Sequence, residues 1–132
     1  MLKRESMPKV MVIDDDKNML SLLDTFLTLE GYQVAKIGGG VSLKGEEVHR
    51  AIQHERPDLI IMDVHLNKVS GLDGFDLLHR LREEPDLSGT YVLMSSGIDF
   101  SQKCKRAGAD GFMMKPFMPE ELLNQIRKYL GP

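Results

Sequence analysis

The sequence contains one cysteine and no tryptophan among its 132 residues. A single cysteine cannot form an internal disulfide, so the composition does not indicate a secreted, disulfide-stabilised domain. No apolar run approaches the roughly 20 residues of a membrane-spanning helix, and residues 1–8 lack the apolar stretch of a signal peptide. Basic and acidic side chains number 17 and 20, which leaves a formal charge of -3 and no excess favouring direct binding to nucleic acid or membranes. These absences predict one cytoplasmic domain with residues 1–8 as an N-terminal extension.

Short apolar runs recur along the chain and stop abruptly at polar residues. Four such runs are residues 10–13, 59–62, 91–94 and 111–114, and a weaker run, residues 32–37, ends at three glycines. Runs of about four residues that are apolar on both faces are typical of parallel strands covered by helices on both sides. The sequence therefore predicts five buried strands.

Between these runs, apolar residues recur at the spacing of amphipathic helices. The predicted helices are residues 19–29 after an N-cap at Asp16, 48–52 ending before Pro57, 75–81 ending before Pro85, 100–107 ending before Gly108, and 122–130 with Pro119 in its first turn. Five strand–helix units in series predict an α/β fold with a parallel sheet and right-handed crossovers. Because five strands are too few for a TIM barrel, the sheet should be open and doubly wound.

Polar side chains follow these strands at their carboxyl ends. They are Asp14 and Asp15 after the first strand, Asp63 after the third, Ser96 after the fourth and Lys115 after the fifth. If the first and third strands are neighbours, three carboxylates converge, and two charges about 4 Å apart repel by roughly 4 kcal/mol at an effective dielectric of 20. Such crowding favours a divalent cation, with Mg²⁺ preferred because it combines carboxylates with waters and a phosphate oxygen. Any one aspartate alone could instead be a turn or capping residue.

The order of these motifs resembles the receiver domain of bacterial two-component response regulators, from Lys9 to Leu130. The matching segments are Val12–Asp15, Pro57–Asp63, Asp73–Leu78, Met94–Gly97 and Gly108–Phe117. The resemblance implies a flavodoxin-like, CheY-like (βα)5 fold with strand order 2-1-3-4-5. It also implies a receiver domain over residues 9–130, followed by a tail of residues 131–132 with no output domain in this chain.

The same resemblance implies roles for the acidic residues. Asp63 matches the phospho-acceptor, and Asp14 and Asp15 match the acidic pair of the magnesium site. His65, two residues beyond the acceptor, matches the position whose backbone carbonyl binds the metal. We therefore expect Mg²⁺ as the cofactor, held by Asp14, Asp15, Asp63 and the carbonyl of His65.

The remaining site residues are assigned in the same way. Ser96 matches the hydroxyl residue that bonds the phosphoryl group, and Lys115 matches the family's lysine. The bond between Lys115 and Pro116 is expected to be cis. Phe112 stands at the aromatic switch position, so Ser96 and Phe112 are expected to respond to phosphorylation.

The resemblance implies a signalling module, with enzymatic activity limited to self-phosphorylation from phosphodonors and autodephosphorylation. The expected donor is a sensor histidine kinase or a histidine phosphotransfer protein. The expected downstream partner is a protein that binds the face formed by residues 100–107, 111–114 and 119–130. Association of two copies of the chain as a homodimer is not decided by the sequence. One alternative is a pseudo-receiver that binds partners without phosphorylation. Another is a haloacid-dehalogenase-like phosphatase, whose nucleophile begins an Asp-x-Asp motif on the first strand; here Asp63 is followed by Val64 and His65, and Asp14-Asp15 lacks the pattern that follows in that family.

Two loops depart from the family pattern. Residues 67–71 lengthen the connection after the acceptor and lack the usual proline, and residues 38–44 form a second long connection, expected as a surface insertion. The histidines have no metal-ligand spacing. His49, His54 and His79 are expected to be solvated, whereas the imidazole of His65 is expected to hang over the site.

Overall fold

The computed structural model of the chain describes residues 7–39, 44–67 and 72–132. Its main sheet has five parallel strands in the order β2-β1-β3-β6-β7. These strands are β1 (Lys9–Asp14), β2 (Gln33–Gly38), β3 (Leu59–Asp63), β6 (Tyr91–Ser96) and β7 (Gly111–Met114). Numbered by their order in the chain, the five strands follow the order 2-1-3-4-5, which confirms the predicted doubly wound fold.

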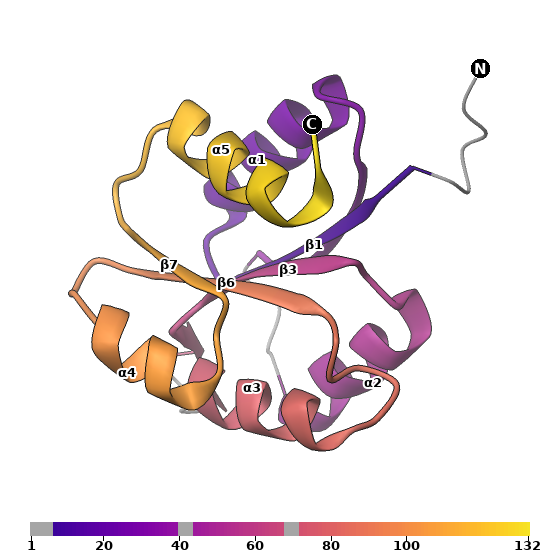
Figure 1. Cartoon of the computed structure of the whole chain (residues 1–132), viewed down its shortest axis with the longest axis vertical. Coiled ribbons are helices and arrows are strands. Elements are labelled where there is room, and N and C mark those ends of the chain that lie inside the picture. The colour runs from indigo at the N-terminus through magenta and orange to yellow at the C-terminus, as the bar shows by residue number, and fades with distance from the viewer. Residues whose placement is uncertain (1–6, 40–43, 68–71) are drawn as a thin grey trace.

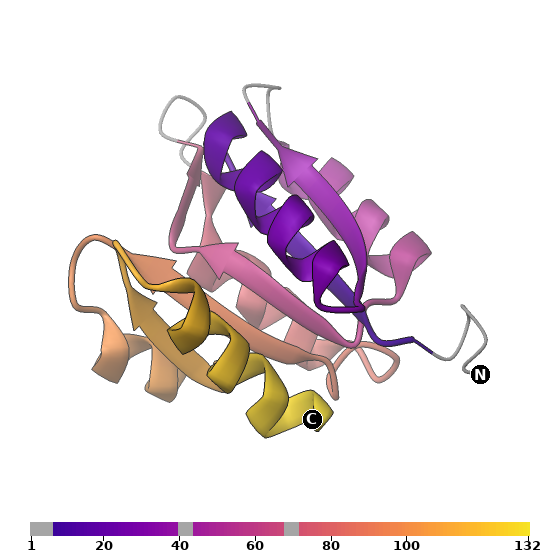
Figure 2. The ribbon, with the colours of Figure 1, turned by 90° about the horizontal axis from the view of Figure 1, so that it is seen from above.

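Helices cover both faces of this sheet (Figure 1). On one face lie α1 (Lys17–Leu29) and α5 (Pro119–Leu130), and on the other lie α2 (Gly45–Glu55), α3 (Gly74–Glu83) and α4 (Ser101–Ala107). Figure 2, seen from above, shows α1 and α5 side by side over the strands. Among the described residues, no helix is both long and apolar enough to cross a bilayer.

Two hydrophobic cores, one on each face, explain why the strands are apolar throughout. Along β1, Val10 and Val12 pack with Leu23 of α1 in one core, whereas Met11 and Ile13 contribute to the other. All four of these strand residues are at most 1% exposed. A strand in a parallel sheet alternates its side chains between two covered faces, so both sets must be apolar.

Capping side chains fix where the helices begin beside the strand ends. Asp16 caps α1 as predicted, because its carboxylate accepts hydrogen bonds from the backbone N–H groups of Asn18 and Met19. Asp73 caps α3 in the same way, accepting from the N–H of Phe75 at 2.8 Å. Both caps place a helix start next to the carboxyl end of a sheet strand.

Two glycines allow close backbone approach at this edge. Gly38 has φ +118°, and a Cβ built there would lie 1.8 Å from the carbonyl oxygen of Asp14. A Cβ on Gly74 would lie 2.7 Å from the carbonyl oxygen of Asp63. A larger residue at position 38 would displace the end of β1 that carries Asp14, and one at position 74 would displace the end of β3 that carries Asp63.

The structure departs from the sequence prediction in two places. After β3, strands β4 (His65–Asn67) and β5 (Leu72–Asp73) form a small antiparallel pair in a region predicted to be a loop. His49 was predicted to be solvated, which is wrong: it is 6% exposed and its Nδ1 lies 3.2 Å from Arg80 Nη2 of α3. His54 and His79 are exposed, as predicted. The inner parts of the two long connections, residues 40–43 and 68–71, lie outside the described residues, as does most of the N-terminal extension.

Candidate functional site

Three carboxylates meet where β1 and β3 end. Asp14 and Asp63 are the last residues of these neighbouring strands, and Asp15 follows Asp14. One carboxylate oxygen from each of the three lies within 4.8 Å of the others. The side chains of Asp14 and Asp63 are only 5% and 14% exposed. The neighbouring strands therefore bring the carboxylates together, as the sequence argument requires.

Among the described residues, one ammonium group contacts this cluster, and it comes from the far edge of the sheet. Lys115, directly after β7, donates hydrogen bonds to Asp14 Oδ2 at 3.0 Å and to Asp63 Oδ2 at 3.2 Å. Its backbone N–H donates to the carbonyl of Ser96 at 2.8 Å, and its bond to Pro116 is cis. With all groups ionised, three carboxylates face one ammonium, and two negative charges are uncompensated within the cluster.

The electrostatics of the cluster shift two pKa values. Burial raises the pKa of Asp63, and the negative charge of Asp14 adds to this, while the ammonium of Lys115 opposes it. Burial alone would lower the pKa of Lys115, but hydrogen bonds and charges from Asp14 and Asp63 outweigh burial and raise it. Lys115 thus stays charged at neutral pH, whereas the negative charge of Asp63 is disfavoured where it stands.

The donor set suits a small, hard divalent cation. Carboxylate oxygens are the ligands that Mg²⁺ prefers, and the two uncompensated charges equal its own. Asp14 is already oriented, because its Oδ1 accepts a hydrogen bond from the N–H of Asp16 at 2.9 Å and its Oδ2 binds Lys115. A cation held between the carboxylates would remove most of their mutual repulsion.

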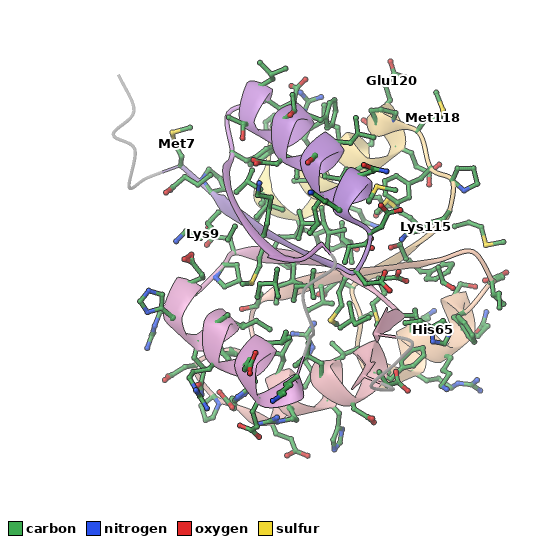
Figure 3. All side chains as sticks on the ribbon, turned by 180° about the vertical axis from the view of Figure 1, so that it is seen from behind. Met7, Lys9, His65, Lys115, Met118 and Glu120 are labelled. Atoms are coloured by element: carbon green, nitrogen blue, oxygen red, sulfur yellow. The ribbon has the colours of Figure 1, made fainter. Side chains whose placement is uncertain are left out.

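The carboxylates open into a pocket of about 300 Å³. The predicted site residues that line it are Asp14, Asp15, Asp63, His65, Ser96 and Lys115. Ser96 is 3% exposed and its Oγ accepts a hydrogen bond from the N–H of Ile98 at 3.2 Å. Figure 3 shows His65 and Lys115 on the same side of the molecule, with Lys9 on the other.

Two predicted residues, Phe112 and Pro116, do not line this pocket. Phe112 is half-buried and packs against the core beneath α2, α3 and α4. Gly97, matched as the small residue beside Ser96, also lines the pocket, whereas Asp16 and Ile98 line it without having been assigned to it from the sequence. Their positions in the sequence could have indicated this, since each lies one or two residues after a residue that was assigned to the site.

Comparisons with known proteins agree on one family. The family model described as the response regulator receiver domain matches residues 10–127. The DNA-binding dual master transcriptional regulator RpaA of Synechocystis is 35% identical over 94% of this chain and 49% of its own length. The curated relatives found are about twice as long as the chain, which spans roughly half of each.

Solved structures show the same fold. The chemotaxis response regulator CheY4 of Vibrio cholerae superposes with a TM-score of 0.81 at 29% identity, covering 95% of this chain and 100% of that one. A CheY-like receiver domain protein of Methanospirillum hungatei gives 0.79 at 26% identity, with 93% of each chain covered.

Proposed function

The chain belongs to the response regulator receiver domain family, and from this premise we propose that Asp63 accepts a phosphoryl group in a magnesium-dependent reaction. The proposed domain comprises residues 9–130. The donor is a histidine kinase or a histidine phosphotransfer protein, since phosphohistidine is a high-energy donor that a positioned carboxylate can attack. We propose signalling, with no turnover of external substrates, as the role of this site.

The observation that carries the proposal is the imbalance of charge in the pocket. Three carboxylates are gathered around one lysine at the carboxyl edge of the sheet, where open α/β folds bind ligands. A structural cluster would be expected to pair its charges. This cluster keeps room for a cation and for a phosphoryl group beside it.

The proposed chemistry is transfer of one phosphoryl group to a carboxylate. An oxygen of Asp63 forms a bond to phosphorus while the bond from phosphorus to the donor's imidazole nitrogen breaks, and the electron pair leaves with that nitrogen. Phosphoryl transfer depends mainly on positioning and charge neutralisation, so the surrounding groups matter more than added reactivity. Hydrolysis of the acyl phosphate by water then returns the carboxylate.

Each neighbouring residue has a part in this scheme. Asp14 and Asp15 would hold Mg²⁺ together with Asp63 and the carbonyl of His65, and the ion would supply positive charge to neutralise phosphoryl oxygens. Lys115 offers its ammonium to a phosphoryl oxygen, replacing its present bond to Asp63.

Ser96 is the proposed reader of the phosphorylated state. Its hydroxyl oxygen now accepts a hydrogen bond from the N–H of Ile98, and on phosphorylation the hydroxyl turns to donate a hydrogen bond to a phosphoryl oxygen. Movement of Ser96 and of Phe112 would then change the face formed by α4, β7 and α5, where a downstream protein binds.

The direct test is labelling with acetyl phosphate and Mg²⁺, followed by intact mass spectrometry. We expect one phosphoryl group per chain, lost in Asp63→Asn and when Mg²⁺ is chelated. Asp24→Asn, which removes an aspartate on α1 remote from the cluster, is the matched control and should label normally. Labelling that survives in Asp63→Asn would contradict the assignment, and an unmodified chain that resists labelling would favour the pseudo-receiver.

A further inference from the structure

Four side chains form a continuous row that leads away from the proposed acceptor. The ring of His65 meets Phe100 edge-on with centroids 5.8 Å apart, and Phe100 meets Phe75 edge-on at 6.0 Å. The ammonium of Lys103 then lies 4.4 Å from the centroid of Phe75. We call these four residues the aromatic row.

The aromatic row joins three separate elements near their starts. His65 is the first residue of β4, Phe75 is in the first turn of α3, and Phe100 is the N-cap residue of α4. The carbonyl of Phe100 also accepts a hydrogen bond from the N–H of Cys104 at 2.8 Å, which closes the first turn of α4. A displacement of Phe100 would therefore change the backbone geometry of the first turn of α4.

Core packing explains Phe75 and Phe100, which are half-buried and pack against the hydrophobic cluster under α2, α3 and α4. It does not explain His65, whose side chain is exposed and still contacts Phe100. An exposed ring contributes little to a core. Burial in the core therefore does not account for the contact between His65 and Phe100.

His65 is well placed to change position with the state of the acceptor. Its backbone N–H points at Asp63 Oδ1, 3.4 Å away, and its residue lines the pocket. Phosphorylation would turn the Asp63 carboxylate into an acyl phosphate, whose acyl oxygens carry no net charge, so this N–H would lose its charged carboxylate acceptor. The segment that carries the imidazole is thus directly exposed to the chemistry at Asp63.

We propose that His65 is a positioning residue whose imidazole transmits the state of Asp63 through Phe100 to the starts of α3 and α4. This inference rests on the proposed function, and it adds a route separate from the one through Ser96 and Phe112. It makes the α3–α4 surface around Phe75 and Lys103 part of what a partner can sense.

The test is the amide spectrum of the ¹⁵N-labelled chain before and after addition of Mg²⁺ with beryllium fluoride, a phosphoryl mimic. In the unmodified chain, the amides of Phe75 and of residues 101–103 should shift along with those of Asp15 and Lys115. His65→Ala keeps the backbone carbonyl assigned to the metal and removes only the imidazole, so the shifts at α3 and α4 should fall by roughly half or more relative to those at Asp15 and Lys115, which report binding of the mimic. His65→Phe keeps an aromatic ring and should restore them.

Two further variants separate transmission from a general loss of structure. His79→Ala removes an exposed histidine of α3 outside the row and should leave all shifts unchanged. Phe100→Leu should reduce the α3 shifts as much as His65→Ala does, and combining the two changes should add little further loss, since both interrupt one route.

The failure of this inference and the failure of the proposed function give different spectra. If the unmodified chain shows no shift at Asp15 or Lys115, the proposed function fails and this inference with it. If those shifts appear but His65→Ala transmits as strongly as the unmodified chain, only the role of His65 is overturned. That role is also overturned if His65→Phe behaves like His65→Ala.

Discussion

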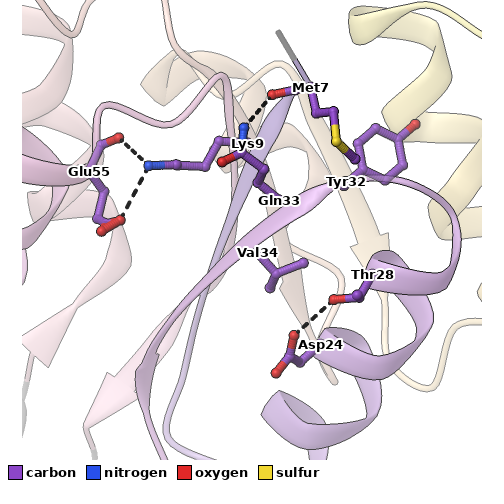
Figure 4. A pocket seen from close by; sticks show the side chains of 8 residues that line it. All are labelled: Met7, Lys9, Asp24, Thr28, Tyr32, Gln33, Val34 and Glu55. Carbon is purple, nitrogen blue, oxygen red and sulfur yellow. Dashed lines mark hydrogen bonds and ion pairs between the residues drawn. The ribbon is translucent and has the colours of Figure 1, made fainter. Parts of the chain in front are cut away.

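Both ends of the sheet carry a pocket lined by charged side chains, but the two pockets differ in whether these charges are paired. At the amino end, a pocket of about 680 Å³ lies between the starts of β1 and β2 and the ends of α1 and α2 (Figure 4). There the Lys9 ammonium lies 3.2 Å from the carbonyl and 3.5 Å from the carboxylate of Glu55. Asp24 is paired with Lys36 at 2.8 Å and accepts a hydrogen bond from Thr28.

At the carboxyl end, a pocket of about 300 Å³ is lined by the three clustered carboxylates and the ammonium of Lys115, together with Asp16, whose carboxylate caps α1. The smaller pocket is thus the one with uncompensated charge. Volume alone would have favoured the amino end, where each of these carboxylates already has a basic partner. Unpaired charge that the fold holds in place, not cavity size, marks the candidate site.

The largest expected effect is on the rate of phosphorylation, which should depend on the carboxylates at the carboxyl end of the sheet and not on those at the amino end. Replacing Asp14 and Asp15 together by asparagine should slow labelling by acetyl phosphate about 100-fold or more, because the cation loses its charged ligands. Glu55→Gln at the amino end should leave the rate unchanged. Rates are measured by intact mass over time at fixed Mg²⁺. A comparable loss in Glu55→Gln would mean that the carboxyl end has no special role.

A smaller effect is expected on stability. Lys115→Met should lower the free energy of unfolding by about 1–3 kcal/mol without Mg²⁺, because buried Asp14 loses its charged donor and faces Asp63 unscreened. Lys9→Met removes a half-exposed ion pair and should cost less than about 1 kcal/mol. Urea unfolding of both variants gives the comparison, and equal costs would contradict it.

The smallest expected effect is an opposite dependence on pH. Burial raises the pKa of Asp63, so its contribution to stability is complete below pH 3.8 and is lost as the pH rises through its folded pKa. The hydrogen bond from Lys36 lowers the pKa of Asp24, so that contribution is present above pH 3.8 and is lost as the pH falls through its folded pKa.

This contrast can be measured against two asparagine variants. As the pH rises without Mg²⁺, the unmodified chain should gain stability relative to Asp24→Asn mainly below pH 3.8 and lose it relative to Asp63→Asn mainly above pH 3.8. Both changes in the free energy of unfolding should be about 1 kcal/mol or less. For Asp24 the reason is that its ion pair is partly exposed to solvent. Unfolding in urea at several pH values measures both differences. Slopes of the same sign would remove the electrostatic distinction between the two ends.

Local signals in the sequence were sufficient for most of the fold. Apolar runs of four residues predicted the five sheet strands because a strand buried on both faces must be apolar at every position. Asp16 was predicted as a helix cap because a short acidic side chain before an apolar stripe satisfies free N–H groups. The carboxylates were recognised by their place at strand ends.

Other features had no local signal. The β4–β5 pair depends on an antiparallel match between His65 and Asp73, which no short pattern shows. His49 was expected to be solvated because it is polar and outside the apolar stripe of its own helix, yet Arg80 of α3 and Glu84 at the end of that helix contact it. Burial of a polar residue depends on partners distant in sequence, so it could not be predicted.

The sequence by itself determined which residues form strands and helices, and that the acidic residues stand at strand ends. These properties depend on the period of apolar residues and on adjacent capping groups, which are local. Only the tertiary structure decided that Lys115 lies between Asp14 and Asp63, and that His65 touches Phe100. Such contacts join residues 35 or more positions apart, and their distances follow from sheet order, crossover geometry and packing on both faces.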